Sequence, residues 1–89
     1  MNLKRNDMGN TTIKLRVKKE IDNSSEQKII KLKGSIIAGG FTEIIHISDE
    51  NEEFYLNSFS INPDARKPAE LFVSDYITAH ELNDLVSLV

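Results

Sequence analysis

The stretch Lys28–Leu56 constrains the fold more than any other part of this 89-residue chain, because it is typical of three consecutive antiparallel strands. Its first segment, Lys28–Ala38, is rich in isoleucine and leads into Gly39–Gly40. A glycine pair supplies the positive φ that a two-residue hairpin turn requires. The register set by this turn places Leu32 opposite Ile47, so apolar residues of both strands share a face.

A second turn, at Glu50–Asn51, extends this register to a third strand, in which Phe54 pairs with Ile47 and Tyr55 pairs with His46. One face of the three predicted strands is apolar and forms the predicted core: Ile30, Leu32, Ile36, Ile45, Ile47, Phe54 and Leu56. The other face mixes polar, basic and apolar residues: Lys31, Lys33, Ile37, Ile44, His46, Tyr55 and Asn57.

The segment Thr11–Lys19 predicts a further strand ahead of this unit. Apolar and basic residues alternate along it with the two-residue period of a half-buried strand, as in Ile13-Lys14-Leu15. Residues 1–10 show no periodicity and are predicted to be a disordered tail. Residues 20–27 are polar and are predicted to be a loop.

The C-terminal third predicts a connection, a strand and a helix. Residues 62–70 contain both prolines of the chain and favour a stiff, turn-rich connection, after which Leu71–Ile77 is typical of a fifth strand. Thr78 and Glu81 have the spacing of a capping box, which predicts a helix from about residue 79 to residue 89.

These patterns together predict a single α+β domain over residues 11–89, mostly β. We expect a five-stranded antiparallel meander, curled or closing into a small barrel, followed by one C-terminal helix. A chain of this length buries one thin core, for which a homodimer would supply further stability.

Composition gives indications of the cellular location and the origin of the protein. The absence of cysteine excludes disulfides and cysteine-based metal sites and favours a cytoplasmic location. The N-terminus lacks the apolar core of a signal peptide, and no apolar run approaches the length of a membrane span, so we expect no membrane association. Eleven isoleucines and eight asparagines against four alanines favour a bacterial or phage origin.

Catalytic and metal-binding signals are weak. The sequence has no nucleophile elbow, phosphate loop or zinc-protease motif, and the acidic run 49–53 lacks the order of a calcium loop. The two histidines, His46 and His80, fall on different predicted elements without a flanking ligand pattern. We therefore expect no catalytic residue, metal or cofactor, and an enzyme that uses His46 is the least favoured interpretation.

Charge is distributed unevenly along the chain, which suggests a nucleic-acid surface as one alternative. Residues 1–35 carry a net charge of +5 and residues 36–89 a net charge of −8. If the first two predicted strands pair, five basic residues form one face bordered by His46 and Tyr55: Lys14, Arg16, Lys18, Lys31 and Lys33. Such a face is typical of surfaces that bind phosphates and stack bases. The alternative without a functional role is that the charges of both halves are simply solvated and attract each other in the fold.

The favoured prediction is a non-enzymatic protein-interaction module, an adaptor or inhibitor that acts through a sheet face and the acidic loops. The candidate sheet face contains four residues: Ile37, Ile44, His46 and Tyr55. An antiparallel sheet with apolar residues on both faces usually has the second face covered by another element or another chain. The acidic C-terminal half favours a basic protein as the partner.

Overall fold

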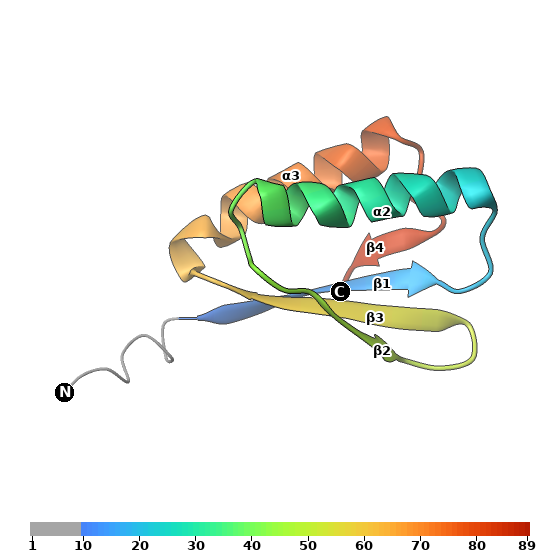
Figure 1. Ribbon diagram of the computed structural model, residues 1–89, viewed down its shortest axis with the longest axis horizontal. Helices are drawn as coiled ribbons and strands as arrows, with labels where there is room; N and C mark the ends of the chain where they lie inside the picture. Colours follow the sequence, from blue (N-terminus) through green and yellow to red (C-terminus); the bar gives the residue numbers. More distant parts are fainter. Residues whose placement is uncertain (1–9) are drawn as a thin grey trace.

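A computed structural model of the chain describes residues 10–89 as an α+β fold with one four-stranded antiparallel sheet and two helices (Figure 1). The predicted disordered tail lies, except for Asn10, outside the described residues. The elements follow one another along the chain as β1 (Thr11–Lys18), α2 (Asn23–Ala38), β2 (His46–Asp49), β3 (Phe54–Ile61), α3 (Pro63–Ala79) and β4 (Val86–Leu88).

The sheet order is β2-β3-β1-β4, and this β-α-β-β-α-β arrangement is a split βαβ topology. Both helices lie on the same side of the sheet, and no helix within residues 10–89 covers the other side (Figure 1). The predicted class, α+β with an antiparallel sheet, is confirmed. The predicted meander of five strands with a single helix is wrong. Within the described part of the chain, the sheet ends at β2 and β4 and does not close into a barrel.

The first predicted strand is confirmed as β1, which lies in the middle of the sheet between β3 and β4. Its apolar residues Ile13, Leu15 and Val17 are buried under the helices. Lys14 and Lys18 point to the opposite, open side and are exposed. The two-residue alternation therefore predicts both the strand and its buried face.

The predicted strand at Lys28–Ala38 and the predicted loop before it are instead helix α2. Asp22 caps the helix by accepting a hydrogen bond from the Ser25 N–H at 3.2 Å. The buried residues of α2 are Ile29, Leu32 and Ile36, whose spacing of three and four residues places them on one helical stripe. The two isoleucine pairs in this segment fit the two-residue period of a strand almost as well as the period of a helix. The glycine pair that follows them favours the strand, which is wrong.

Gly39–Gly40 ends this helix and does not form a hairpin turn. The N–H of Gly39 donates to the carbonyl of Ser35, and Gly40 has a φ of 81°, the left-handed conformation common just after a helix. The chain then crosses to the far edge of the sheet before β2 begins at His46 (Figure 1).

The predicted hairpin between the second and third strands exists as β2–β3, but in a different register. His46 pairs with Ser58 and Ile47 with Asn57, instead of the predicted Tyr55 and Phe54. The loop is longer than predicted because the Asn51 side chain accepts hydrogen bonds from the N–H groups of Glu53 and Phe54. The shift of three residues moves Tyr55 to the face that packs toward the helices.

The C-terminal predictions are wrong because residues 63–79 form helix α3. Asn62 caps this helix and Pro63 occupies its first turn, where a missing N–H costs nothing. Pro68 is tolerated inside it. The predicted capping box, Thr78 and Glu81, instead marks the end of α3: Glu81 has a φ of 55°, and the last residues form β4.

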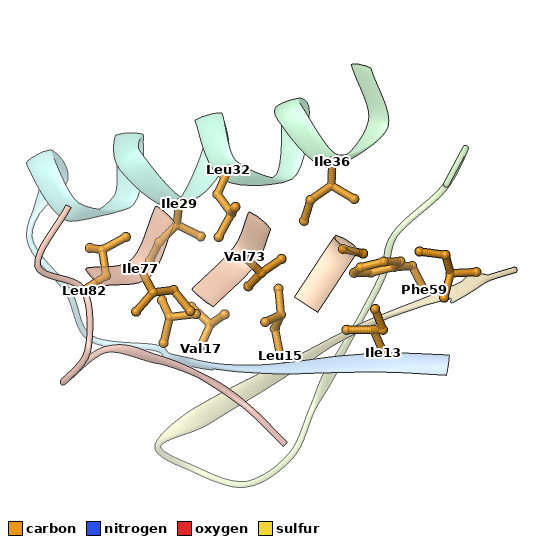
Figure 2. Packing of buried hydrophobic residues seen from close by; sticks show 13 residues of the cluster. Ile13, Leu15, Val17, Ile29, Leu32, Ile36, Phe59, Val73, Ile77 and Leu82 are labelled. Atoms are coloured by element: carbon orange, nitrogen blue, oxygen red, sulfur yellow. The ribbon is translucent and has the colours of Figure 1, made fainter. Parts of the chain in front are cut away.

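One apolar core joins the two helices to the sheet (Figure 2). Leu32 of α2 and Val73 of α3 are completely buried above Leu15 of β1. Phe59 of β3 is the largest fully buried side chain. Within residues 10–89 neither helix is long and apolar enough to span a membrane.

Candidate interaction surface

Exposed apolar residues are concentrated on one half of the molecule. Of the seven large hydrophobic side chains that are exposed within residues 10–89, five belong to α2, the loop after it, β2 or β3: Ile30, Ile37, Ile44, Ile47 and Tyr55. The remaining two are Leu71 on α3 and Val89 after β4. Single exposed apolar residues are normal, but a concentration of them marks an interaction surface.

The structural cause is that the helices leave the β2 edge uncovered. All four residues of β2 are exposed, although Ile47 and Asp49 point to the same face as the core. In the cross-strand row that runs from Leu15 of β1 through Asn57 of β3 to Ile47 of β2, the residues change from buried and apolar to buried and polar to exposed. We call the resulting surface the β2 shelf, defined as Ile47 and Asp49 of β2, Tyr55 and Asn57 of β3, and Ile30 and Lys33 of α2.

A hydrogen bond between α2 and β3 lies at the centre of the β2 shelf. The Lys33 ammonium donates to the Asn57 Oδ1 at 3.4 Å, and Asn57 is only 1% exposed. Partial burial lowers the pKa of Lys33 below its ordinary value, because an ammonium loses hydration there. Among the residues that the structure describes, Lys33 is the hydrogen-bond partner of the Asn57 side chain.

Lys19 and Asp49 flank Tyr55 at the end of the shelf. The Lys19 ammonium lies 5.1 Å from the centroid of the Tyr55 ring, and 3.2 Å from a carboxylate oxygen of Asp49. Asp49 is also the cross-strand partner of Tyr55. The cation–π contact and the ion pair together restrict the Tyr55 ring while leaving it partly exposed.

A hollow of about 110 Å³ adjoins the shelf between α2 and β3. Its walls include Ile30, Lys33 and Tyr55, together with Ile21 and Ile29. This volume is well below the roughly 300 Å³ at which small-molecule pockets begin. The hollow therefore has the size for an inserted side chain and not for a cofactor.

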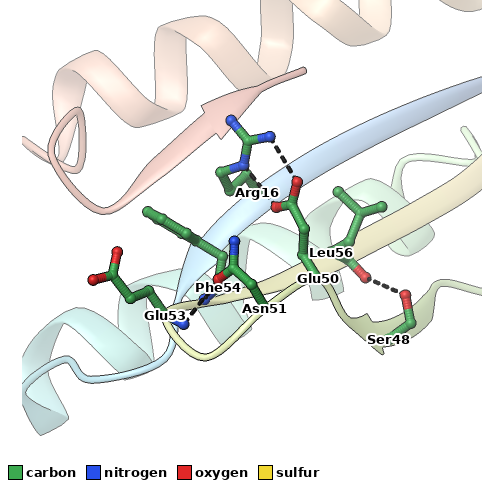
Figure 3. Close-up of polar contacts among 7 residues, drawn as sticks. All are labelled: Arg16, Ser48, Glu50, Asn51, Glu53, Phe54 and Leu56. Atoms are coloured by element: carbon green, nitrogen blue, oxygen red, sulfur yellow. Dashed lines mark hydrogen bonds and ion pairs between the residues drawn. The ribbon is translucent and has the colours of Figure 1, made fainter.

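A second surface is the open side of the sheet. The residues of β1 that point there are Lys14, Arg16 and Lys18, with Thr12 beyond them. Arg16 makes a two-pronged ion pair with the Glu50 carboxylate, with both nitrogen–oxygen distances 2.7 Å (Figure 3). Its guanidinium also lies 5.6 Å from the centroid of the Phe54 ring. The Arg16 charge is thus already matched within the chain.

The five residues of the predicted basic face do not form one surface. Lys14, Arg16 and Lys18 share the open side of the sheet, as their alternation predicts. Lys31 is exposed on α2, and Lys33 points into the shelf, because their segment is a helix on the other side of the sheet. The basic stretch is therefore divided between the two sides of the sheet.

The four residues of the predicted sheet face are also separated. Tyr55 lies in the β2 shelf, whereas His46 points to the open side of the sheet, where its partner is Ser58. Ile37 is exposed on α2, and Ile44 is exposed in the loop that precedes β2. All four remain accessible, but only Tyr55 belongs to the shelf.

The sequence interpretation placed Ile30 and Ile47 in the core and Asn57 on the second face of the predicted strands. It included Asp49 only in the acidic run 49–53 and gave Lys19 no role. Helical spacing would have indicated that Ile30 is exposed. Ile29, Leu32 and Ile36 form the buried stripe of α2, which leaves Ile30 on another side of the helix. No local pattern identifies the contact between Lys33 and Asn57, which are 24 residues apart.

The two histidines lie on separate elements. His46 is exposed in β2, while the His80 ring lies 4.1 Å from the Tyr76 ring at the end of α3. Among residues 10–89 there is no group of three or more His, Cys, Asp or Glu residues placed to hold a metal ion.

Comparisons with protein-family models, with curated proteins and with solved structures find no match to this chain.

Proposed function

We propose that this protein is a non-enzymatic interaction module, an adaptor or inhibitor, that binds another protein through the β2 shelf. The observation that carries the proposal is the exposure of Ile30 and Ile47, 51% and 57% respectively, beside the β2 edge, which pairs with no further strand among residues 10–89. Both residues lie next to the buried core, so a partner that covers them would extend it.

The composition of the shelf supports binding to a protein. Protein interfaces combine an apolar centre and aromatic side chains with a polar rim. Here Ile30, Ile47 and Tyr55 provide apolar and aromatic area, while Asp49 and Lys33 provide charged groups beside it. Full burial of an isoleucine contributes about 1.5–3 kcal/mol, so covering the exposed half of each isoleucine contributes roughly 1 kcal/mol or more. Tyr55, held by Lys19 and Asp49, is already restricted before a partner binds.

Affinity capture with paired variants tests the proposal. Immobilised wild-type protein is expected to retain a stoichiometric partner from a lysate of the source organism, and the double variant Ile30→Lys and Ile47→Lys is expected to lose it. Leu71→Lys is the matched control, because Leu71 is 62% exposed but lies on α3 outside the shelf. Circular dichroism establishes that all three proteins are folded. Capture of no partner, or equal capture by all three proteins, contradicts the proposal.

The second candidate function is nucleic-acid binding through the open side of the sheet. The observation that favours it is that Lys14, Arg16 and Lys18 share this side with the Phe54 ring. Basic side chains beside an aromatic ring provide phosphate contacts and a stacking surface. The ion pair between Arg16 and Glu50 weakens this candidate, because it neutralises the central charge of the row.

Fluorescence anisotropy with single-stranded and duplex oligonucleotides separates the two functions. If nucleic acid binds, log K falls with log salt, and the double variant Lys14→Glu and Lys18→Glu lowers the slope by roughly 0.7–0.9 for each phosphate that the protein no longer neutralises. Lys67→Glu, which changes an exposed lysine on α3, is the matched control. The absence of binding at low salt, or an unchanged slope in the double variant, removes this candidate.

A further inference from the structure

Among residues 10–89, no strand pairs with the outer side of β2, so the backbone on that side has no hydrogen-bond partner there. The Glu50 N–H donates to the Phe54 carbonyl at 2.9 Å, which fixes the phase of the antiparallel ladder. His46 and Ser48 therefore direct their backbone groups to β3, whereas Ile47 and Asp49 direct theirs away from the sheet. Two N–H groups and two carbonyls thus face solvent along the outer edge of β2, in the arrangement that accepts another strand.

The side chains near this edge select the charge of the added strand. Residues 41–54 contain five acidic residues and no lysine or arginine. Asp49 and Glu50 are paired with Lys19 and Arg16. The other three, Glu43, Glu52 and Glu53, form no ion pair among the residues that the structure describes. Glu52 and Glu53 line a hollow together with Lys18, Lys19 and Glu20 at the end of β1. These lysines and Arg16 offset the acidic residues only in part, so a strand along this edge meets an excess of negative charge.

A second copy of this chain fits the edge poorly. In an antiparallel pair of β2 strands, the acidic turn after Asp49 of one copy lies beside the segment around Glu43 of the other. Like charges placed opposite each other across strands are destabilising. A basic segment removes this repulsion and gains attraction from the same residues.

We infer that β2 binds an extended basic segment of another protein, which adds to the sheet as a fifth, antiparallel strand. The inference rests on the proposed function and specifies its partner. Residues directly opposite each other across two strands share a face, so the segment needs an apolar residue opposite Ile47 and a lysine or arginine opposite Asp49. The apolar and the basic position of the segment are two residues apart. Further basic residues at the end of the segment that lies toward Glu52 and Glu53 complete the charge complementarity.

The probe is a labelled nine-residue peptide that contains one basic-x-apolar unit preceded by two further lysines. Two control peptides have the same length: one replaces each lysine with glutamate, and the other carries backbone N-methyl groups on the two residues that would pair with Ile47 and Asp49. Fluorescence anisotropy is expected to detect binding of the unmodified basic peptide only. In NMR spectra of the protein, the amide signals of residues 46–49 are expected to shift on binding.

Protein variants test the edge directly. Ile47→Pro removes an N–H that faces solvent and leaves the hydrogen bonds to β3 intact, so it is expected to weaken binding about tenfold, the loss expected for one hydrogen bond of about 1.4 kcal/mol. Ile47→Thr is the matched control, because it retains the N–H. The pair Glu52→Lys and Glu53→Lys is expected to weaken binding, whereas Asp75→Lys and Asp84→Lys, at exposed sites on and after α3, are not.

Several outcomes overturn the inference: no binding of the basic peptide at low salt, equal binding of the N-methylated peptide, or equal affinity of the Ile47→Pro and Ile47→Thr proteins. Concentration-dependent dimerisation with shifts at residues 46–49 also overturns it, because the occupant is then a second copy. If the peptide fails but the lysate partner is still lost from the Ile30→Lys and Ile47→Lys variant, the proposed function stands and only the strand-addition inference falls.

Discussion

The Lys33 ammonium donates a hydrogen bond to Asn57 across the gap between α2 and β3, which places one polar pair beside an otherwise apolar core. Asn57 is buried, so the variant Lys33→Met leaves the side-chain oxygen of Asn57 without a hydrogen-bond partner. This variant is expected to lower the free energy of unfolding by about 1–3 kcal/mol. The double variant Lys33→Met and Asn57→Leu replaces both polar groups by apolar ones and is expected to return to near the wild-type stability.

Urea denaturation of the wild type, both single variants and the double variant measures this coupling as a double-mutant cycle. Additive losses in the double variant would show that the Lys33–Asn57 contact contributes nothing to stability. A stable double variant also permits a test of the proposed function, since it keeps the shape of the β2 shelf and removes its polar centre.

Leu32 and Ile30 distinguish the helix from the strand that the sequence pattern favours. A strand places both residues on one buried face, whereas in α2 Leu32 is 0% exposed and Ile30 is 51% exposed. Leu32→Ala is therefore expected to lower the free energy of unfolding by about 2–5 kcal/mol, because it leaves a cavity in the core. Ile30→Ala is expected to cost less than about 1 kcal/mol, and equal losses measured by thermal or urea unfolding would argue against the helix.

Gly34 and Gly40 are expected to respond to alanine in opposite directions. Gly34 lies inside α2, and an added Cβ there would meet no atom within 4 Å, so Gly34→Ala is expected to stabilise the protein by about 0.5–1 kcal/mol. Gly40 has a φ of 81°, and Gly40→Ala is expected to cost about 1–2 kcal/mol in the left-handed conformation. Calorimetric unfolding temperatures that change in the same direction would contradict this assignment of the two glycines.

The parts of the fold that sequence patterns predict correctly are those whose period is unambiguous. Ile13, Leu15 and Val17 alternate with basic residues, and only a strand explains that order. The segment that forms α2 contains isoleucine pairs that are compatible with both a strand and a helix. Only the residues at the ends of the segment distinguish the two structures. Asp22 before this segment, and Asn62 before Pro63, were the helix-start signals that mattered.

The candidate surface was less predictable because it depends on register and on helix placement. A shift of three residues in the β2–β3 pairing moves Tyr55 from one face of the sheet to the other. The β2 shelf also needs α2 to lie beside β3, a contact that joins Lys33 to a residue far along the chain. Tertiary packing sets both relationships, and no local pattern contains them.

The pair formed by Arg16 and Glu50 predicts a specific dependence of stability on pH. Hydrogen bonds from the Arg16 guanidinium hold the pKa of the Glu50 carboxyl below its ordinary value of 4.5. A carboxyl whose pKa is lower in the folded state stabilises the fold above its unfolded pKa, and this contribution is lost as the pH falls through the folded pKa. The stability difference between the wild type and Glu50→Gln is therefore expected to be constant above about pH 5 and to shrink as the pH falls below 4.5. Urea unfolding at a series of pH values measures it, and the same comparison made in an Arg16→Gln background is expected to lose the pH dependence. A dependence that persists without Arg16 would contradict the assignment of the lowered pKa of Glu50 to the Arg16 guanidinium.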